Sequence, residues 1–126
     1  MSDLTQNEMR YNVYDPGCPS RQVLDHVTGR WGILVLGTLR EGTRRFSELH
    51  RALGGVSEKM LAQTLRVLER DGLVHRVAYP VVPPKVEYSL THRGREIAEL
   101  TVRLVGWVEG NTPTIIAERT DRQGTV

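Results

Sequence analysis

The chain has 126 residues, of which 39% are apolar and 25% are charged, and it carries one cysteine and a formal net charge of +2. This length and composition fit one domain with a modest core, and no stretch approaches the roughly 20 consecutive apolar residues of a membrane span. The polar N-terminus also lacks the charged-then-apolar pattern of a secretion signal, so we expect a cytoplasmic protein with no membrane partner.

The first third of the chain predicts an arm followed by two helices. Residues 1–17 are polar and end in the turn pair Pro16-Gly17, which indicates a loosely held N-terminal arm. Pro19 suits the first position of a helix to about His26, because the N–H that proline lacks would have no helical partner there. Residues 31–39 are apolar on nearly every side, which predicts a central buried helix.

The next segment has the pattern of a helix-turn-helix. A short helix begins at Phe46, we expect Ser47 to be its N-cap, and a glycine pair closes it. A short link leads to Ser57, a second N-cap residue. The helix after it ends at Asp71-Gly72, where glycine can adopt the left-handed conformation that terminates helices.

The second helix has two chemically different faces. Leucines that we assign to the core share one face, namely Leu61, Leu65 and Leu68. Cationic and amide side chains share the nearly opposite face, namely Lys59, Gln63, Arg66 and Arg70. Lys and Arg pair with phosphates or guanine edges and Gln pairs with adenine, so this face suits a DNA major groove. A solvated surface helix would look the same in isolation, but the flanking elements favour DNA.

A β-hairpin is predicted after the second helix. Val74–Val81 and Lys85–Leu90 are rich in Val and Tyr, and they flank Pro83-Pro84. Proline cannot donate a hydrogen bond to a strand ladder, so this pair belongs at the hairpin tip. The sequence therefore predicts a mainly α-helical winged helix-turn-helix domain, residues 18–111, with a small β-hairpin wing.

A last helix is expected from His92 to about Glu109, with Thr91 as its N-cap, and residues 112–126 are expected to form a frayed tail. This helix has two apolar rows, one of Ile97, Leu100, Leu104 and Val108 and one of Ala98, Val102 and Val105. Together they make a stripe wider than one core contact needs. One row can pack inside while the other meets a second subunit; the alternative is that both rows cover a single small core.

Positive charge is concentrated in the predicted helix-turn-helix and wing. Residues 40–95 hold eleven Lys and Arg against six Asp and Glu, a net charge of +5, so the rest of the chain carries −3. A basic module within an acidic frame favours contact with phosphates.

We predict eight DNA-binding residues. We expect Ser57 and Lys59, at the start of the second helix, to meet phosphates or base edges, with Gln63, Thr64 and Arg66 one or two turns deeper. Arg45 and Ser47 begin the preceding helix and are expected to fix phosphates. Lys85 lies beside the proline pair and is expected to reach the minor groove or the flanking backbone. Arg44, Arg70 and Arg76 are weaker candidates, since each can simply solvate a surface.

The run VSEKMLAQTLRVLERDGLVHRVAYPVVPPKVEYSLTHRG closely resembles the core of the HxlR-type bacterial transcription regulators, a winged-helix group related in architecture to MarR-type regulators. The resemblance extends back to Cys18-Pro19 and forward to Trp107. Mild departures are Arg30, where the family commonly has Lys before Trp, and the Gly54-Gly55 turn. The resemblance implies a transcription regulator, which we expect to be a repressor.

The same resemblance implies a homodimer built by the last helix and the N-terminal helix. A two-fold dimer presents two recognition helices to successive major grooves, so double-stranded DNA with an inverted repeat is the expected partner, its half-sites about 34–36 Å apart.

Cys18 is the one residue that adds a possible regulatory signal. As the only cysteine it excludes a disulfide within the chain, and its place before Pro19 puts the sulfur at a helix N-terminus, where amide dipoles favour the thiolate. Several HxlR-type regulators sense electrophiles, quinones or oxidants through a cysteine in this region. The resemblance thus implies a redox sensor, with a small electrophile or ligand as partner; a small packing residue is the equal alternative.

Other function classes are disfavoured. His26, His50, His75 and His92 have no ligand spacing, one cysteine cannot supply a zinc thiolate site, and there is no glycine-rich phosphate loop or nucleophile elbow. We therefore expect no enzyme, no metal and no cofactor. A winged helix used as a protein-interaction module, with its basic face on an acidic partner, remains the alternative to DNA binding.

Overall fold

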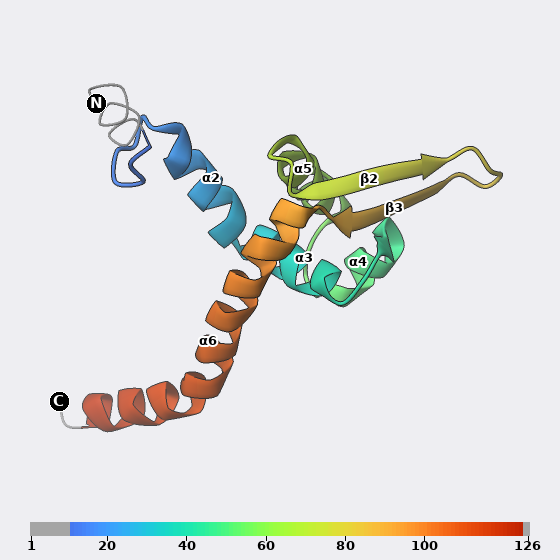
Figure 1. Ribbon diagram of the computed structural model, residues 1–126. Helices are drawn as coiled ribbons and strands as arrows, with labels where there is room; N and C mark the ends of the chain where they lie inside the picture. The colour runs from blue at the N-terminus through green and yellow to red at the C-terminus, as the bar shows by residue number, and fades with distance from the viewer. Residues whose placement is uncertain (1–10, 125–126) are drawn as a thin grey trace, which may run out of the picture.

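The computed structural model describes residues 11–124, which form five helices and three short strands. In chain order these are α2 (Pro19–Thr28), α3 (Arg30–Arg40), β1 (Arg44–Arg45), α4 (Phe46–Ala52), α5 (Glu58–Arg70), β2 (Val74–Tyr79), β3 (Lys85–Leu90) and α6 (His92–Gly124). Helices α3, α4 and α5 gather around the base of the β2–β3 hairpin (Figure 1). The hairpin projects from one side of this body, and α6 extends from the other (Figure 1). The mainly helical winged helix-turn-helix predicted from the sequence is confirmed.

The three strands form an antiparallel sheet in the order β1-β3-β2. The hairpin register pairs Val74 with Leu90 at its base and Tyr79 with Lys85 at its outer end. Strand β2 ends two residues earlier than predicted, and residues 80–84 form the tip. Strand β1 was not predicted, because two consecutive arginines carry no alternating pattern and the strand exists only through its pairing with β3.

The core lies where the three central helices meet the sheet. Its fully buried side chains include Leu36 of α3, Leu49 of α4, and Leu61, Leu65 and Leu68 of α5. Burial of one leucine side chain contributes about 2 kcal/mol, so the leucine face of α5 fixes that helix against the body. The predicted division of α5 into a core face and an open face is therefore confirmed.

The start of α6 is locked onto the turn that follows α5. Thr91 caps the helix as predicted, because its Oγ1 accepts a hydrogen bond from the Gly94 N–H at 2.9 Å. The same hydroxyl donates to the Gly72 carbonyl at 2.7 Å. Gly94 admits this approach because a Cβ there would lie 1.9 Å from the Leu73 carbonyl oxygen. The position of α6 is thus tied to the end of α5.

Helix α4 begins at Phe46 as predicted, but its N-cap residue differs from the prediction. Arg45, rather than Ser47, is the N-cap residue, and Ser47 lies inside the first turn. The Glu48 carboxylate accepts a hydrogen bond from the Arg45 backbone N–H at 2.7 Å, which is the reciprocal half of a capping box. Glu48 therefore selects Arg45, two residues before Ser47, as the N-cap residue.

The prediction of a frayed tail after residue 111 was wrong for residues 112–124, which continue α6. Pro113 lies inside the helix, and the ribbon bends in this C-terminal half (Figure 1). Beyond the bend, an ion pair of 3.1 Å joins Glu118 to Arg122 one turn later. Polar composition and a proline thus predicted a helix end where the chain only bends.

The described part of the N-terminal arm, residues 11–17, is more ordered than predicted. It forms successive turns, and the Cys18 N–H donates to the Asp15 carbonyl at 3.0 Å. The Arg21 guanidinium of α2 donates to the carbonyls of Val13 and Tyr14 at 2.7 and 3.2 Å. Residues 1–10 of the arm lie outside the described residues. Between residues 11 and 124, no helix is long and apolar enough to cross a membrane.

Candidate nucleic-acid interface

Helix α5 is held at both ends so that its polar face stays outward. Ser57 Oγ accepts a hydrogen bond from the Met60 N–H at 3.0 Å, which confirms the predicted N-cap. At the other end Gly72 has φ +76°, and the Leu73 N–H donates to the Leu68 carbonyl at 2.9 Å. The buried leucines fix the rotation of the helix between these caps, and Lys59, Gln63 and Arg66 are all exposed. This face is therefore available to an external ligand.

Two side chains of the polar face are already paired with each other. Arg66 Nη2 donates to Gln63 Oε1 at 3.0 Å. With its oxygen accepting from Arg66, the Gln63 side chain retains its amide N–H₂ group, which can donate to acceptors such as purine N7. The pair thus offers hydrogen-bond donors and a positive charge on one turn of helix.

Thr64 is less available than Lys59 or Gln63. Its Oγ1 donates to the Met60 carbonyl at 2.8 Å, and the residue is half-buried toward α2 and α3. It therefore lies at the side of the polar face rather than along its centre.

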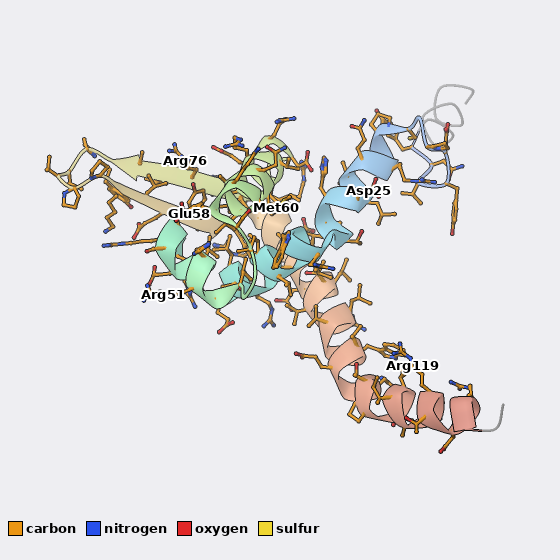
Figure 2. All side chains as sticks on the ribbon, turned by 180° about the vertical axis from the view of Figure 1, so that it is seen from behind. Asp25, Arg51, Glu58, Met60, Arg76 and Arg119 are labelled. Carbon is orange, nitrogen blue, oxygen red and sulfur yellow. The ribbon has the colours of Figure 1, made fainter. Side chains whose placement is uncertain are left out.

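The N-terminus of α4 adds a second exposed group of predicted residues. Arg45 and Ser47 are exposed, whereas Arg44 is half-buried and donates through Nη1 to the Thr43 carbonyl at 3.0 Å. Figure 2 shows Arg51 of α4, Glu58 and Met60 of α5, and Arg76 of β2 on the same body of the molecule. Helix α4, helix α5 and the wing thus belong to one body, and each carries an exposed cationic side chain.

Lys85, the predicted wing contact, is partly occupied within the hairpin. Its Nζ lies 3.5 Å from Glu87 Oε2 and 5.0 Å from the centre of the Tyr79 ring. A hydrogen bond to Glu87 raises the pKa of the Tyr79 hydroxyl above its ordinary value. Lys85, Glu87 and Tyr79 thus form one cluster, and a phosphate that contacts Lys85 would share its ammonium with Glu87.

Arg30, a departure from the family pattern in the sequence, lies near α5. Its guanidinium lies 5.8 Å from the centre of the Trp31 ring, and both residues border a hollow that Met60 and Gln63 also line. Gly32 permits the tight corner before it, because a Cβ there would lie 2.0 Å from the His26 carbonyl oxygen. No local sequence pattern places Arg30 beside α5, since that proximity comes from the packing of α2 and α3 on α5.

Cys18 is buried, with 4% of its surface exposed, at the N-cap of α2. Its Sγ accepts a hydrogen bond from the Asn12 N–H at 3.3 Å. Burial acts to raise the pKa of the thiol, but hydrogen bonds from Ser20 and Asn12 outweigh it, so the pKa lies below its ordinary value of 9.0. The thiol of Cys18 thus has a lowered pKa although it is buried.

The apolar stripe of α6 is divided between core and surface. Ala98 is buried, Val102 and Val105 are half-buried against α3, and Ile97 also packs on the core. The remaining row is open to solvent, with Leu100 58% and Trp107 59% exposed and with Leu104 and Val108 also exposed. Val23 and Leu24 of α2 are exposed as well. A continuous exposed row of this kind on a helix marks an interaction surface.

Comparison with known proteins identifies the family. The model of HxlR-like helix-turn-helix proteins matches residues 26–115. The HTH-type transcriptional regulator YtfH of Escherichia coli is 56% identical over 119 residues, which cover 94% of this chain and 94% of that protein. The structure of the transcriptional regulator YtfH from Salmonella typhimurium has a TM-score of 0.84 at 56% identity, covering 86% of this chain and 97% of that one.

A second solved structure, the redox regulator HypR in its oxidized form, has a TM-score of 0.68 at 40% identity and covers 75% of this chain and 97% of that one. The matched family, the relatives and the capped, exposed α5 beside a β-hairpin agree with one another. The chain is a winged helix-turn-helix transcriptional regulator that belongs to the HxlR-like family.

Proposed function

We propose that this protein is a homodimeric repressor that binds an inverted-repeat operator overlapping a promoter. The observation that carries the proposal is the outer face of α5, where Lys59, Gln63 and Arg66 are exposed opposite three buried leucines. Such a face offers a cation for phosphates or guanine and an amide for purine edges. We propose that Ser57 and Thr64 of α5, Arg45 and Ser47 at the start of α4, and Lys85 of the wing add further contacts to the DNA.

The dimer is supported by the exposed apolar row of α6. Leu100, Leu104, Trp107 and Val108 would be covered by the same row of a second copy, together with Val23 and Leu24 of α2. Replacement of Leu104 by Glu places a charge in this row, so we expect light scattering to show a monomer where the unchanged protein is a dimer. A matched exposed change on the same helix, Arg103→Glu, should leave the dimer intact. A monomeric unchanged protein would contradict the homodimer.

The DNA-binding proposal is tested by selection of native genomic fragments followed by anisotropy measurements on a recovered 30-base-pair duplex. We expect the fragments to share one inverted repeat, and we expect affinity to fall steeply as salt rises. Weak and equal binding to every duplex would favour the protein-interaction module instead. A reporter gene placed behind the recovered fragment then tests the sign of regulation, because a repressor lowers its expression.

We also propose that oxidation of Cys18 controls the affinity of the protein for DNA. The lowered pKa of the thiol and the likeness to the redox regulator HypR support it. Because Cys18 is the only cysteine, a disulfide between subunits would join the Cys18 side chains of the two copies. Diamide would take the two hydrogen atoms from these thiols and become the hydrazine.

Mass spectrometry and anisotropy after diamide treatment test this signal. We expect a modified Cys18 and a changed affinity for the duplex, with no change in a Cys18→Ser variant. Full modification with unchanged affinity would leave Cys18 as a packing residue.

A further inference from the structure

The wing carries a positively charged residue on the face that looks toward α5. Residues opposite each other in an antiparallel pair point to the same face, and successive residues alternate. The buried pair Val74 and Leu90 defines the face that packs on the helices. Arg76, two residues beyond Val74, pairs with Tyr88 and shares that face. Lys85 pairs with Tyr79 on the opposite face.

A hollow of about 390 Å³ lies between α5 and this face of the sheet. Arg66 and Glu69 line it from α5, and Arg76 and Tyr88 line it from the strands. Among residues 11–124, Arg76 makes no ion pair, and the hydrogen bond of the Arg66 side chain is to the neutral Gln63. Two guanidinium groups thus face one carboxylate in the hollow, which leaves a net charge of +1.

We propose that Arg66 and Arg76 hold a backbone phosphodiester of DNA in this hollow. The inference rests on the proposed function: if α5 enters the major groove and the hairpin tip approaches the neighbouring minor groove, the strand that separates the two grooves passes between them. A guanidinium is planar and offers two parallel N–H groups to phosphate oxygens. Arg76 therefore anchors the wing through the backbone, independently of base sequence.

The register also separates Arg76 from Lys85 as wing contacts. Both are cations on one hairpin, but the Lys85 ammonium already lies beside Glu87 and the Tyr79 ring. Exchange of Glu87 for a phosphate replaces one charge pair by another, so the gain in binding is small. Lys85→Ala is consequently a comparison variant, since it removes the same charge from the opposite face of the same hairpin and should lose less affinity than Arg76→Ala.

The test is fluorescence anisotropy with the recovered 30-base-pair duplex and with a scrambled duplex of equal composition. Arg76→Ala should raise the Kd about tenfold on both duplexes and lower the slope of log K against log salt by about one, as expected for a lost phosphate contact. The Kd of Arg76→Lys should lie between the Kd of the unchanged protein and that of Arg76→Ala. Arg119→Ala is the control and should change the Kd less than about threefold, because Figure 2 shows Arg119 far along α6. Lys85→Ala should raise the Kd less than Arg76→Ala does. Thermal melting by circular dichroism checks that each variant is folded.

A double variant tests whether the two arginines share one phosphate. If they do, Arg66→Ala combined with Arg76→Ala loses less affinity than the product of the single losses. In the unchanged protein, a neutral methylphosphonate at one backbone position per half-site should weaken binding about tenfold, and Arg76→Ala should be insensitive at that position. If the methylphosphonate weakens binding equally in Arg76→Ala and in the unchanged protein, the assignment of this phosphate to Arg76 is wrong.

The outcomes separate this inference from the proposed function. If the unchanged protein binds the duplex with a steep salt dependence and Arg76→Ala behaves like Arg119→Ala, the inference alone is wrong. If the unchanged protein does not bind the duplex, both fail. If inorganic phosphate binds in an Arg76-dependent way at constant ionic strength while duplex binding does not depend on Arg76, the hollow takes a free anion and the proposal is overturned.

Discussion

His26 Nδ1 of α2 lies 2.6 Å from Asp71 Oδ2, at the residue that ends α5. Cys18 is the N-cap residue of α2, so one ten-residue helix has the thiol at its start and, near its end, a contact with the residue that caps α5. A displacement of α2 would therefore reach α5 through this pair. The contact also links elements 45 residues apart in the sequence.

Loss of the contact should loosen the end of α5. We expect His26→Ala to lower the free energy of unfolding by about 1 kcal/mol, the usual contribution of one partly buried hydrogen bond, and to lower the Tm by about 4 °C. Hydrogen exchange should quicken at the Asp71 and Leu73 amides. The exposed His75→Ala is the control, and equal effects from both variants would show that the pair contributes nothing.

Two glycines of α6 should respond in opposite ways to alanine. Gly94→Ala places a Cβ against the Leu73 carbonyl, so the free energy of unfolding should fall by about 3 kcal/mol. Gly110→Ala has no neighbouring atom within 4 Å of the added Cβ and should raise it by about 0.7 kcal/mol, because alanine loses less backbone entropy than glycine. Urea unfolding of both variants measures the difference. A tolerated Gly94→Ala would contradict the tight approach of α6 to this turn.

The ion pair between Arg40 of α3 and Glu99 of α6 should depend on pH. Arg40 Nε lies 2.7 Å from Glu99 Oε1, and the hydrogen bond from Arg40 lowers the pKa of the Glu99 carboxyl below its ordinary value. A carboxyl with a lowered pKa contributes stability above its unfolded-state pKa of about 4.5 and loses it as pH falls through the folded-state value. Both side chains are largely exposed, so the contribution is small.

Glu99→Gln tests this dependence. Its Tm should lie below that of the unchanged protein at pH 7, and the gap should close as pH falls below about 4. Glu96→Gln, an exposed carboxyl on the same helix, should show no such gap. A gap that persists unchanged at pH 3 would mean that the charge of Glu99 is not its source.

The lowered pKa of Cys18 should depend on Ser20. The Ser20 side chain is one of the groups whose hydrogen bonds lower the thiol pKa, so Ser20→Ala should move that pKa upward. The rate of alkylation by iodoacetamide at pH 7.5 should then fall, since the thiolate is the reactive form. Thr28→Ala, at the other end of α2, serves as the control. A faster alkylation of Ser20→Ala would show that access of the reagent to the buried thiol, rather than ionisation of the thiol, sets the rate.

Sequence reasoning succeeded where the determining interactions are local. Ser57, Gly72 and Thr91 lie within a few residues of the groups that they cap, and the leucine spacing of α5 fixes its buried face without reference to the rest of the chain. The bounds and the buried face of α5 and the start of α6 were therefore predicted correctly.

It failed where pairing across the fold decides the outcome. The two-residue strand β1 exists through its pairing with β3, and the strand register, which the composition of the wing does not reveal, places Arg76 toward α5 and Lys85 away from it. The length of α6 was also underestimated, because Pro113 bends this helix without ending it.

The most direct measurement of the central claim compares affinities for the recovered duplex and a scrambled duplex before and after the outer face of α5 is removed. The unchanged protein should prefer the recovered duplex by about 1,000-fold or more, and a variant with Lys59, Gln63 and Arg66 all replaced by alanine should lose most of that preference while melting at a similar temperature. A triple variant that keeps the full preference would show that this face does not contact the bases, and the proposed mode of operator recognition would be wrong.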